Sequence, residues 1–492
     1  MKFIRGTKRE FLIIGIGSLI SCVLYITYNA FESGLGFPLD DAWIHHTFAR
    51  NLAYYGEWSF IAGETSGAST GPLWGMMLAL LYLLRIPAVW GTYFIGFLIV
   101  WALGIGGLNL GIRLFPKSKP RQLVMGLMCT LEWHLVWGAL SGMETMVLSL
   151  LSLWVFCWLL DKKDTWFNAG LLIGLSVWIR PDGLTLVGPA LLSMALRGYK
   201  PKKMIWQSIS FIFGLLVVVL PYFLFNYVVA GDVWPNTFYA KQAEYAFLRD
   251  LPLLSRLGTV SYQVIVGIGI VILPGLMFEI IDLLKKIDWE RMGAVLWAFG
   301  YIVIYAWRLP VAYQHGRYIM PVMPVIFLMG LAGMLKLVNI EADERWKRIL
   351  GRSWLAIAGI TLLMFLGLGA RSFALDVGVI NSEMVEVAEW VNKNTPDDAI
   401  IAAHDIGALG YFGDRQIRDL AGLISPEVIT FLWDDKQLAK YLDEQGVDYL
   451  YTFTDWYPGL TPGLEIAYQT DGDYAERFGF EKTAVYYWKD SQ

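Results

Sequence analysis

The sequence is poor in charged residues, in cysteine and in basic tracts, and each shortage excludes a class of protein. Only 17% of its 492 residues are charged, against about 25% in soluble domains, which excludes an ordinary soluble protein. The three cysteines, Cys22, Cys129 and Cys157, lie in apolar runs and predict neither a disulfide framework nor a metal site. No run of lysine and arginine indicates a nucleic-acid partner.

Hydrophobic residues make up 56% of the chain and aromatic residues 15%, a composition that predicts a polytopic α-helical membrane protein. Residues 1–9 are basic and lead into an apolar run from 11 to 31. That run is longer than a signal-peptide core and lacks a cleavage site of small residues, so we expect a retained first span. Its basic flank should stay in the cytoplasm.

Ten further apolar segments bring the expected number of transmembrane helices to about eleven. They cover residues 88–112, 122–140, 145–160, 165–179, 184–196, 205–229, 259–284, 293–307, 318–338 and 353–370. The apolar segment at 72–84 is excluded, because a helix of this kind reaches only about 22 Å of the ~30 Å hydrocarbon core. We expect it to be a juxtamembrane helix at the outer surface.

The basic residues support this assignment. With 72–84 left out, the basic clusters at 113–121, 162–163, 197–203, 285–291 and 336–352 share one side with the N-terminus. Counting 72–84 as a span would move every later cluster outside, against the positive-inside rule. We therefore expect a cytoplasmic N-terminus and an external C-terminus.

Two domains are expected, with a boundary near Arg371. Residues 1–371 form the membrane domain, with a large outer loop at 32–87, and residues 372–492 have the composition and size of a soluble domain. Apolar patterns in the second domain predict helices and strands in alternation, which is typical of a small α/β domain. The helices are expected near 385–391 and 436–445, and the strands at 399–403 and 447–451.

The outer loop carries two adjacent carboxylates, Asp40 and Asp41, at the start of an amphipathic helix. Asp40 suits the N-cap position and Asp41 the first turn, where the helix dipole favours negative charge. The helical pattern continues to Tyr55, and Gly56 is a plausible C-terminal stop. The pair is either an ordinary helix start or a catalytic site.

Other polar residues fall on the same expected outer side. Each has a plain structural alternative, since Glu144 could cap a helix and Arg180 and Arg317 could extend to the interface. Their convergence on one face favours a functional site. They lie in Glu64–Gly67, Ser69–Pro72, Ser141–Glu144, Arg180–Gly183, Gly231–Lys241 and Gln314–Tyr318.

The series of motifs resembles a known family. Asp-Asp, Thr-Gly-Pro-Leu-Trp, Ser-Gly-Met-Glu-Thr, Arg-Pro-Asp-Gly, Pro-Asn-Thr-Phe-Tyr-Ala-Lys, Arg-Tyr-x-x-Pro and Asp-Ile-Gly-Ala-Leu-Gly-Tyr occur in this order. The series is similar to that of bacterial GT-C glycosyltransferases, most of all those related to the mycobacterial arabinofuranosyltransferases. Protein O-mannosyltransferases and lipid A aminoarabinose transferases are more distantly similar. The resemblance covers nearly the whole chain.

The resemblance implies a reaction. Such enzymes take a sugar from a polyprenyl phosphate on the outer face of the bacterial plasma membrane and pass it to an acceptor hydroxyl, with inversion. A carboxylate serves as general base, and the resemblance assigns that role to the aspartate pair. Asp41 is preferred because Asp40 is the better cap, although the reverse assignment stays open. If both face the site, repulsion should raise the pKa of one.

The remaining expected site residues bind substrates. The leaving lipid phosphate needs cationic donors, for which Lys241 and Arg317 are preferred. Arg180 and His315 are further candidates. Glu144, Asn236 and Tyr239 are expected to contact substrate. His404 and Asp405 follow a strand, where they form either a ligand site or a tight turn against the membrane domain.

Partners and cofactors follow from the same reasoning. We expect a polyprenyl-phosphate sugar donor, membrane lipids, and a glycan, lipid or protein acceptor. A divalent ion is a candidate cofactor, with Asp40, Asp41, Glu144, His45 and His46 as candidate ligands.

Two other functions are weighed against the enzyme. A transporter or flippase of lipid-linked glycans should carry ionisable groups in mid-span and inverted halves, whereas here most such groups lie at span ends. A scaffold subunit derived from such an enzyme should have lost the aspartate pair, which is present.

Overall fold

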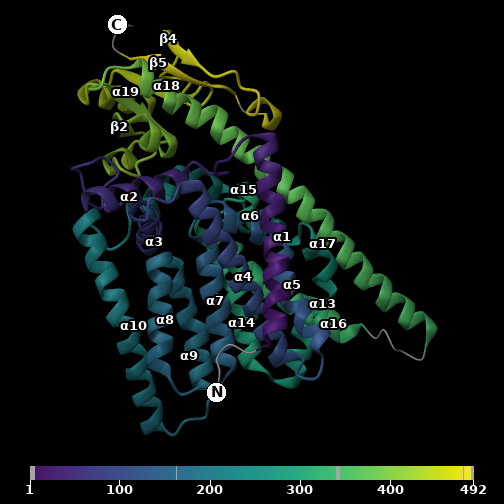
Figure 1. The fold of residues 1–492 in the computed structure, drawn as a ribbon. Helices are drawn as coiled ribbons and strands as arrows, with labels where there is room; N and C mark the ends of the chain where they lie inside the picture. Colours follow the sequence, from purple (N-terminus) through teal and green to yellow (C-terminus); the bar gives the residue numbers. More distant parts are fainter. Residues whose placement is uncertain (1–5, 162, 339–343, 480, 489–492) are drawn as a thin grey trace.

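The computed structural model describes residues 6–161, 163–338, 344–479 and 481–488. Residues 1–5 and Lys162 of the predicted basic clusters therefore lie outside the described residues. The chain forms a helical bundle with a mixed α/β domain at one end (Figure 1). The N-terminal helix begins at the opposite end of the bundle from that domain.

Helices account for most of the described chain. In order they are α1 (Lys8–Glu32), α2 (Asp41–Tyr55), α3 (Pro72–Leu83), α4 (Ala88–Leu114), α5 (Lys119–Leu131), α6 (Trp133–Leu140), α7 (Thr145–Leu160), α8 (Trp166–Ile179), α9 (Val187–Ala195), α10 (Pro201–Ala230), α11 (Asn236–Glu244), α12 (Leu253–Ile265), α13 (Ile268–Lys286), α14 (Trp289–Arg308), α15 (Tyr313–Gly316), α16 (Met323–Leu337), α17 (Arg345–Val379), α18 (Glu386–Asn394) and α19 (Asp435–Glu444).

Five helices in the described ranges are long and apolar enough to cross a membrane, or seven if each of two bent pairs is one span. The span predicted at 259–284 is bent, because α12 and α13 meet at 105°. Gly267 lies between them with φ +77°, a conformation that side chains rarely adopt. The axes of α5 and α6 differ by 49° where Glu132 adopts an extended backbone and caps α6. The total of eleven spans stays a prediction.

The outer loop forms the two predicted surface helices. Helix α2 begins at Asp41 and ends before Gly56, whose φ of +73° makes the left-handed C-cap that the sequence predicts. Helix α3 has 12 residues, about 18 Å of length, which is too short to cross a bilayer. It packs on α2 near the end of the bundle that carries the α/β domain (Figure 1).

Several of the predicted basic clusters meet at the other end. Lys119 Nζ lies 2.8 Å from Glu10 Oε1 at the start of α1. Arg113 pairs at 2.8 Å with Asp161, which follows α7, and α10 begins at this end as well (Figure 1). The connections α4–α5 and α9–α10 therefore share the side of the N-terminus. Which side faces the cytoplasm stays a prediction.

The C-terminal domain is built on a five-stranded sheet in the order β2-β1-β3-β5-β4, in which β1 pairs in parallel with β2 and β3 and the remaining pairs are antiparallel. The strands are β1 (Ile400–Ala403), β2 (Gln416–Asp419), β3 (Tyr449–Phe453), β4 (Ile466–Gln469) and β5 (Thr483–Tyr487). The two predicted strands and both predicted helices are confirmed, and β2, β4 and β5 are additional.

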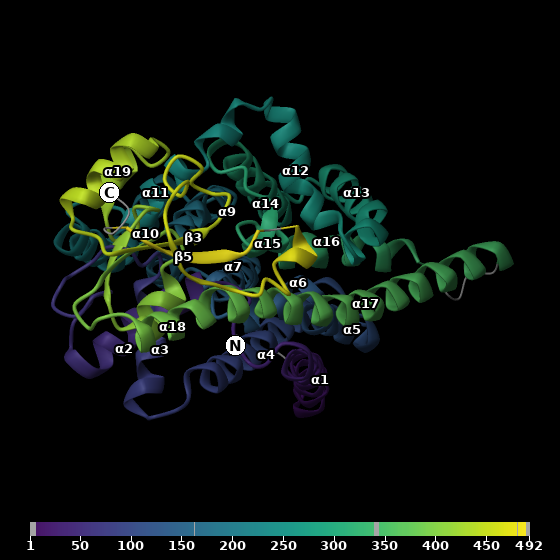
Figure 2. The same ribbon diagram turned by 90° about the horizontal axis from the view of Figure 1, so that it is seen from above.

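A continuous helical path joins the two domains. Helix α17 runs through a π-helical turn at Ile380–Val385 into α18, so the boundary predicted near Arg371 falls inside a helix. Figure 2 shows α17 reaching from beyond one side of the bundle to the C-terminal domain. The domain is thus attached through a continuous helical segment.

Candidate functional site

A cavity of about 320 Å³ opens between the α2 end of the bundle and the C-terminal domain. Five residues expected from the sequence to act on substrate line it: Asp41, Glu144, Arg180, Lys241 and Arg317. They come from α2, the α6–α7 turn, the segment after α8, α11 and the segment after α15. The fold thus gathers residues that are widely separated in the sequence.

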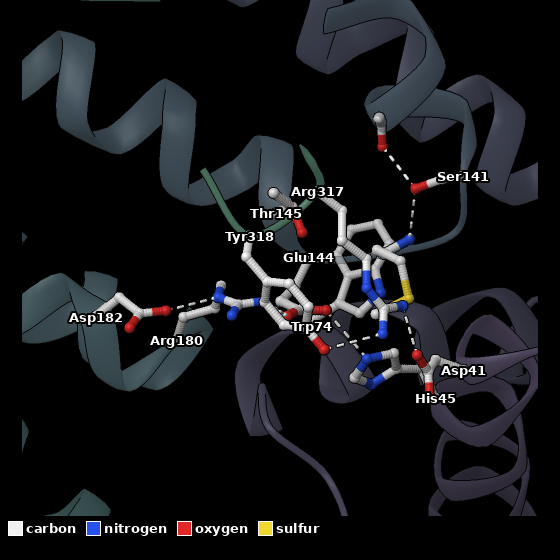
Figure 3. Close-up of polar contacts among 12 residues, drawn as sticks. Asp41, His45, Trp74, Ser141, Glu144, Thr145, Arg180, Asp182, Arg317 and Tyr318 are labelled. Atoms are coloured by element: carbon white, nitrogen blue, oxygen red, sulfur yellow. Dashed lines mark hydrogen bonds and ion pairs between the residues drawn. The ribbon is translucent and has the colours of Figure 1, made fainter. Parts of the chain in front are cut away.

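Asp41 is hydrogen-bonded directly to a cation. Arg317 Nη1 donates to Asp41 Oδ2 at 2.5 Å (Figure 3). Burial raises the pKa of Asp41, but the charges of Arg317 and Lys241 outweigh burial and bring the pKa below its usual value. Asp41 is therefore an ionised carboxylate at neutral pH.

An aromatic ring lies between Arg180 and Arg317 in the cavity. Arg317 Nη2 donates to the Tyr318 hydroxyl at 3.1 Å, and the Arg317 Cζ lies 4.9 Å from the centre of the Tyr318 ring. The Arg180 Cζ lies 5.9 Å from the same ring. Both guanidinium groups are within the range of cation–π attraction. Arg317 Nε is buried and has no hydrogen-bond partner among the described residues.

Arg180 is fixed in the wall of the cavity by hydrogen bonds to neighbouring side chains. Its Nε donates to Asp182 at 2.9 Å, Nη1 to Glu144 at 2.7 Å, and Nη2 to the Tyr305 hydroxyl at 3.2 Å. The second Glu144 oxygen lies 3.0 Å from His45 Nε2, one turn along α2 from Asp41. All three nitrogens of Arg180 thus have protein partners.

Glu144 is fully buried beneath this wall. Burial raises its pKa, but Arg180 and His45 more than offset burial and lower the pKa to about 2. The adjacent turn is tight, with φ +81° at Gly142, whose carbonyl oxygen accepts a hydrogen bond from Trp74 Nε1 at 2.9 Å. Glu144 therefore holds α2 and Arg180 together as a charged anchor.

Lys241 connects the cavity to the C-terminal domain. Its Nζ lies 2.8 Å from Glu244 Oε2, and Glu244 Oε1 lies 3.8 Å from His404 Nε2. His404 Nδ1 is 2.7 Å from the Tyr457 hydroxyl. Burial lowers the pKa of Lys241, but Glu244 and Asp41 raise it well above its usual value, so the amine is charged.

Asp40 faces the C-terminal domain, unlike Asp41. Its two oxygens accept hydrogen bonds from the backbone N–H groups of Gly407 (2.6 Å) and Ala408 (2.7 Å). The predicted N-cap bond is not made within the described residues. The carboxylate accepts hydrogen bonds from these distant N–H groups instead. Burial and the nearby Asp405 raise the pKa of Asp40 above its usual value, with a smaller effect of Asp41, while the two backbone N–H donors favour the ionised form. The predicted repulsion therefore comes mainly from Asp405.

The structure separates other expected site residues from this cavity. His315 lies beside α17, with Nε2 2.8 Å from Asp376 Oδ2. Asn236 bridges two segments behind the cavity wall, because its backbone N–H donates to Gly67 O and its side chain to Leu423 O. The Tyr239 hydroxyl donates to Asp232 at 2.8 Å.

Several residues of the site had no predicted role. Asp182, Thr237 and Tyr318 belong to the motif series, and their motifs were the available signal. The Thr237 hydroxyl is buried beside the cavity without a hydrogen-bond partner in the described ranges. Tyr305 and Glu244 lie in ordinary helices and carried no sequence signal.

The predicted metal ligands are not gathered around one point. Within the described part of the chain, no group of three or more histidine, cysteine or acidic residues could hold a metal ion. His46 contacts Tyr82 and Thr92 with its two ring nitrogens, at 2.8 and 3.0 Å, while Asp40 and Asp41 bind partners in different domains. These donors do not fit a metal site.

Comparisons with known proteins support the same fold. Residues 377–488 match a domain of unknown function, DUF8728, and no curated protein sequence matches the chain. Among solved structures, ArnT from Cupriavidus metallidurans in the apo state is 14% identical, with 96% of this chain and 97% of that chain covered and a TM-score of 0.60.

Two further solved structures cover most of this chain. Archaeal oligosaccharyltransferase AglB from Archaeoglobus fulgidus is 11% identical, with 91% and 69% of the two chains covered and a TM-score of 0.61. Arabinofuranosyltransferase AftD from Mycobacteria is 15% identical, with a TM-score of 0.51; the match covers 99% of this chain but only 40% of AftD. The chain therefore has the fold of the GT-C glycosyltransferases, as the motif series predicted.

Proposed function

We propose that this protein transfers a sugar from a polyprenyl phosphate to an acceptor hydroxyl on the outer face of a bacterial plasma membrane. One observation carries the proposal: the ionised Asp41 carboxylate lines a cavity together with Arg317 and Lys241. Displacement at an anomeric carbon needs a base for the attacking hydroxyl and cations for the leaving phosphate. Both kinds of group are present at one place.

The donor class has support from the structural neighbours. ArnT from Cupriavidus metallidurans has also been solved bound to undecaprenyl phosphate; that structure is 13% identical, covers 99% of both chains and has a TM-score of 0.55. AglB has been solved with a dolichol-phosphate and an inhibitory peptide. Both lipids place a phosphate at the end of a long apolar chain, which suits a charged cavity at the end of an apolar bundle.

The proposed reaction is a single displacement with inversion. Asp41 accepts the proton of the acceptor hydroxyl while the oxygen of that hydroxyl forms a bond to the anomeric carbon. The bond from that carbon to the phosphate oxygen breaks, and polyprenyl phosphate leaves toward Arg317 and Lys241. A positioned general base contributes about 10²- to 10⁴-fold to such a step.

Donor binding would activate the base. Arg317 donates a hydrogen bond to Asp41 and lowers its pKa. A phosphate group competes with Asp41 for the guanidinium, and every hydrogen bond that Arg317 gives to the phosphate weakens its hold on the carboxylate. Asp41 then becomes more basic only when the donor is present. The buried Arg317 Nε and Thr237 hydroxyl are further donors for the phosphate or the sugar.

Donor consumption tests the proposal. Wild type, Asp41→Asn and the control Asp232→Asn, in lipid nanodiscs, are incubated with a panel of polyprenyl-phosphate sugars and envelope extract. Mass spectrometry follows free polyprenyl phosphate. Wild type and the control should consume one donor, and Asp41→Asn should be at least ~100-fold slower. If instead no donor is consumed and labelled lipid-linked sugar crosses the bilayer of proteoliposomes, the transport alternative replaces the enzyme.

A further inference from the structure

Residues at the start of α2 and within it form hydrogen bonds with both ends of one short segment of the C-terminal domain. Gly407 and Ala408 begin a helical turn and donate their N–H groups to the two oxygens of Asp40, at 2.6 and 2.7 Å. At the other end of the turn, Arg50 donates to the carbonyl oxygens of Tyr411 (2.7 Å) and Gly410 (3.2 Å). Each charge meets the end of the turn that it stabilises, an anion at the N–H groups and a cation at the carbonyls.

Aromatic packing fills the space between these charged contacts. The Trp43 ring lies 4.8 Å from the rings of both Tyr411 and Phe412. The Arg50 Cζ lies 5.0 Å from the Tyr411 ring, and the Tyr82 hydroxyl donates to that of Tyr411 at 3.2 Å. The contact therefore combines an apolar centre with charged, directional ends, as a specific interface does.

Backbone proximity makes the contact specific at Gly407. A Cβ atom at this position would lie 2.0 Å from the backbone oxygen of Asp40. Only glycine lets these two backbone segments approach this closely. The sequence Asp-Ile-Gly-Ala-Leu-Gly-Tyr thus fits the surface of α2 with a defined register.

We propose that Asp40 and Arg50 form a clamp that docks segment 407–413 on α2 and thereby positions His404 beside Glu244, the partner of the cavity residue Lys241. The inference rests on the proposed function and gives Asp40 a positioning role, distinct from that of the base. The Asp405 carboxylate precedes the clamped turn and interacts electrostatically with Lys241 and Asp41.

The clamp also reaches the phosphate-binding lysine. His404 lies next to Glu244, which pairs with Lys241. If the clamped segment moves away from α2, His404 moves with it and Glu244 loses a neighbour. Release of the clamp should therefore loosen α11 as well as segment 404–413.

Amide hydrogen exchange tests the clamp in full-length protein in nanodiscs. The variants are Asp40→Asn and Arg50→Gln, with Glu389→Gln and Lys393→Gln as controls that remove the same charges from the exposed face of α18. The clamp predicts that both test variants speed exchange in 404–413 at least ~10-fold, since a hydrogen bond to a charged group is lost in each. Exchange in 236–244 should rise too, and the controls should match wild type.

Turnover separates positioning from proton transfer. Both clamp variants should consume the donor more slowly. The pH profile of kcat/KM for Asp40→Asn should still fall at low pH as the wild-type profile does, because Asp41 is still the base. Unchanged exchange in both variants would overturn the clamp. So would loss of turnover in Asp40→Asn with full turnover in Arg50→Gln. A wild type that consumes no donor contradicts the proposed function alone, and the exchange result still decides whether the clamp exists.

Discussion

Arg317 and Asp41 are 276 positions apart in the sequence and share a hydrogen bond of 2.5 Å in the cavity. The proposed base and the proposed phosphate ligand are therefore hydrogen-bonded to each other. The arrangement keeps Asp41 ionised, and it makes the basicity of Asp41 depend on what Arg317 binds. The pH dependence of catalysis should expose this coupling.

Arg317→Gln should move the acidic limb of the kcat/KM profile to higher pH. The guanidinium favours the ionised form of Asp41, so its removal leaves burial as the largest influence and raises the pKa of Asp41. Because kcat/KM reports groups of the free enzyme, wild type should lose activity at a lower pH than the variant. Arg308→Gln is the control, since Arg308 lines the cavity but bonds to Gln242. Superimposable profiles for wild type and Arg317→Gln would contradict the coupling.

Tyr318 should act on donor affinity through its ring more than through its hydroxyl. Tyr318→Phe keeps the face that lies near Arg180 and Arg317 and loses one hydrogen bond. That loss is worth about 1 kcal/mol, or a several-fold rise in KM for the donor. Tyr318→Leu also loses both cation–π contacts and should raise KM at least ~10-fold. Equal effects of the two substitutions would assign the role to the hydroxyl.

Glu144→Gln should destabilise the fold, because Glu144 is a buried partner of Arg180. Breaking such a pair costs about 3 kcal/mol at neutral pH, while Glu389→Gln on the surface should cost almost nothing. The native pKa of Glu144, about 2, lies below its ordinary value of 4.5, so the ionised form favours folding. This contribution is complete above pH 4.5 and is lost as the pH falls toward 2.

The measurement compares the free energy of unfolding of wild type and Glu144→Gln in detergent between pH 7 and pH 3. The difference between them should shrink as the pH falls below 4.5. A difference that stays constant over this range would show that the side chain acts by packing alone.

Local signals predicted the local structure well. Helix α2 starts at the aspartate pair and ends before Gly56 because capping preferences and helical periodicity are properties of short segments. The strand at Ile400–Ala403 follows from its buried apolar run. The motif series indicated the GT-C fold through its resemblance to that family, and its residues Asp41, Glu144, Arg180, Lys241 and Arg317 line the cavity.

The sequence could not show which partner each polar residue takes. Asp40 looks like a helix cap, but its hydrogen-bond donors are 367 and 368 positions away, and no local pattern encodes that choice. His315 lies two residues before Arg317, yet it contacts Asp376 instead of the cavity. The bend at Gly267 was hidden as well, because hydropathy averages over a window and does not register a single glycine with positive φ. Short edge strands such as β4 give too few residues for an alternating pattern.

The orientation in the membrane gives the last prediction. Lys202 lies in the first turn of α10, at the end of the bundle shared with the N-terminus, and Lys440 lies on α19 in the domain at the other end (Figure 1). Both side chains are exposed, and the native cysteines are buried. Single cysteines at these two positions should therefore react with a membrane-impermeant maleimide from opposite sides of the membrane.

In intact bacterial spheroplasts, Lys440→Cys should be labelled at once and Lys202→Cys only after permeabilisation, with wild type unlabelled throughout. This outcome follows from the positive-inside rule, because the basic connections lie on the side of Lys202. The reverse pattern would place the cavity in the cytoplasm, where Asp41 would face soluble sugar donors. Labelling of both positions from one side would mean that the bundle does not span the membrane along the axis joining its two ends. The orientation therefore decides which pool of donors reaches the carboxylate.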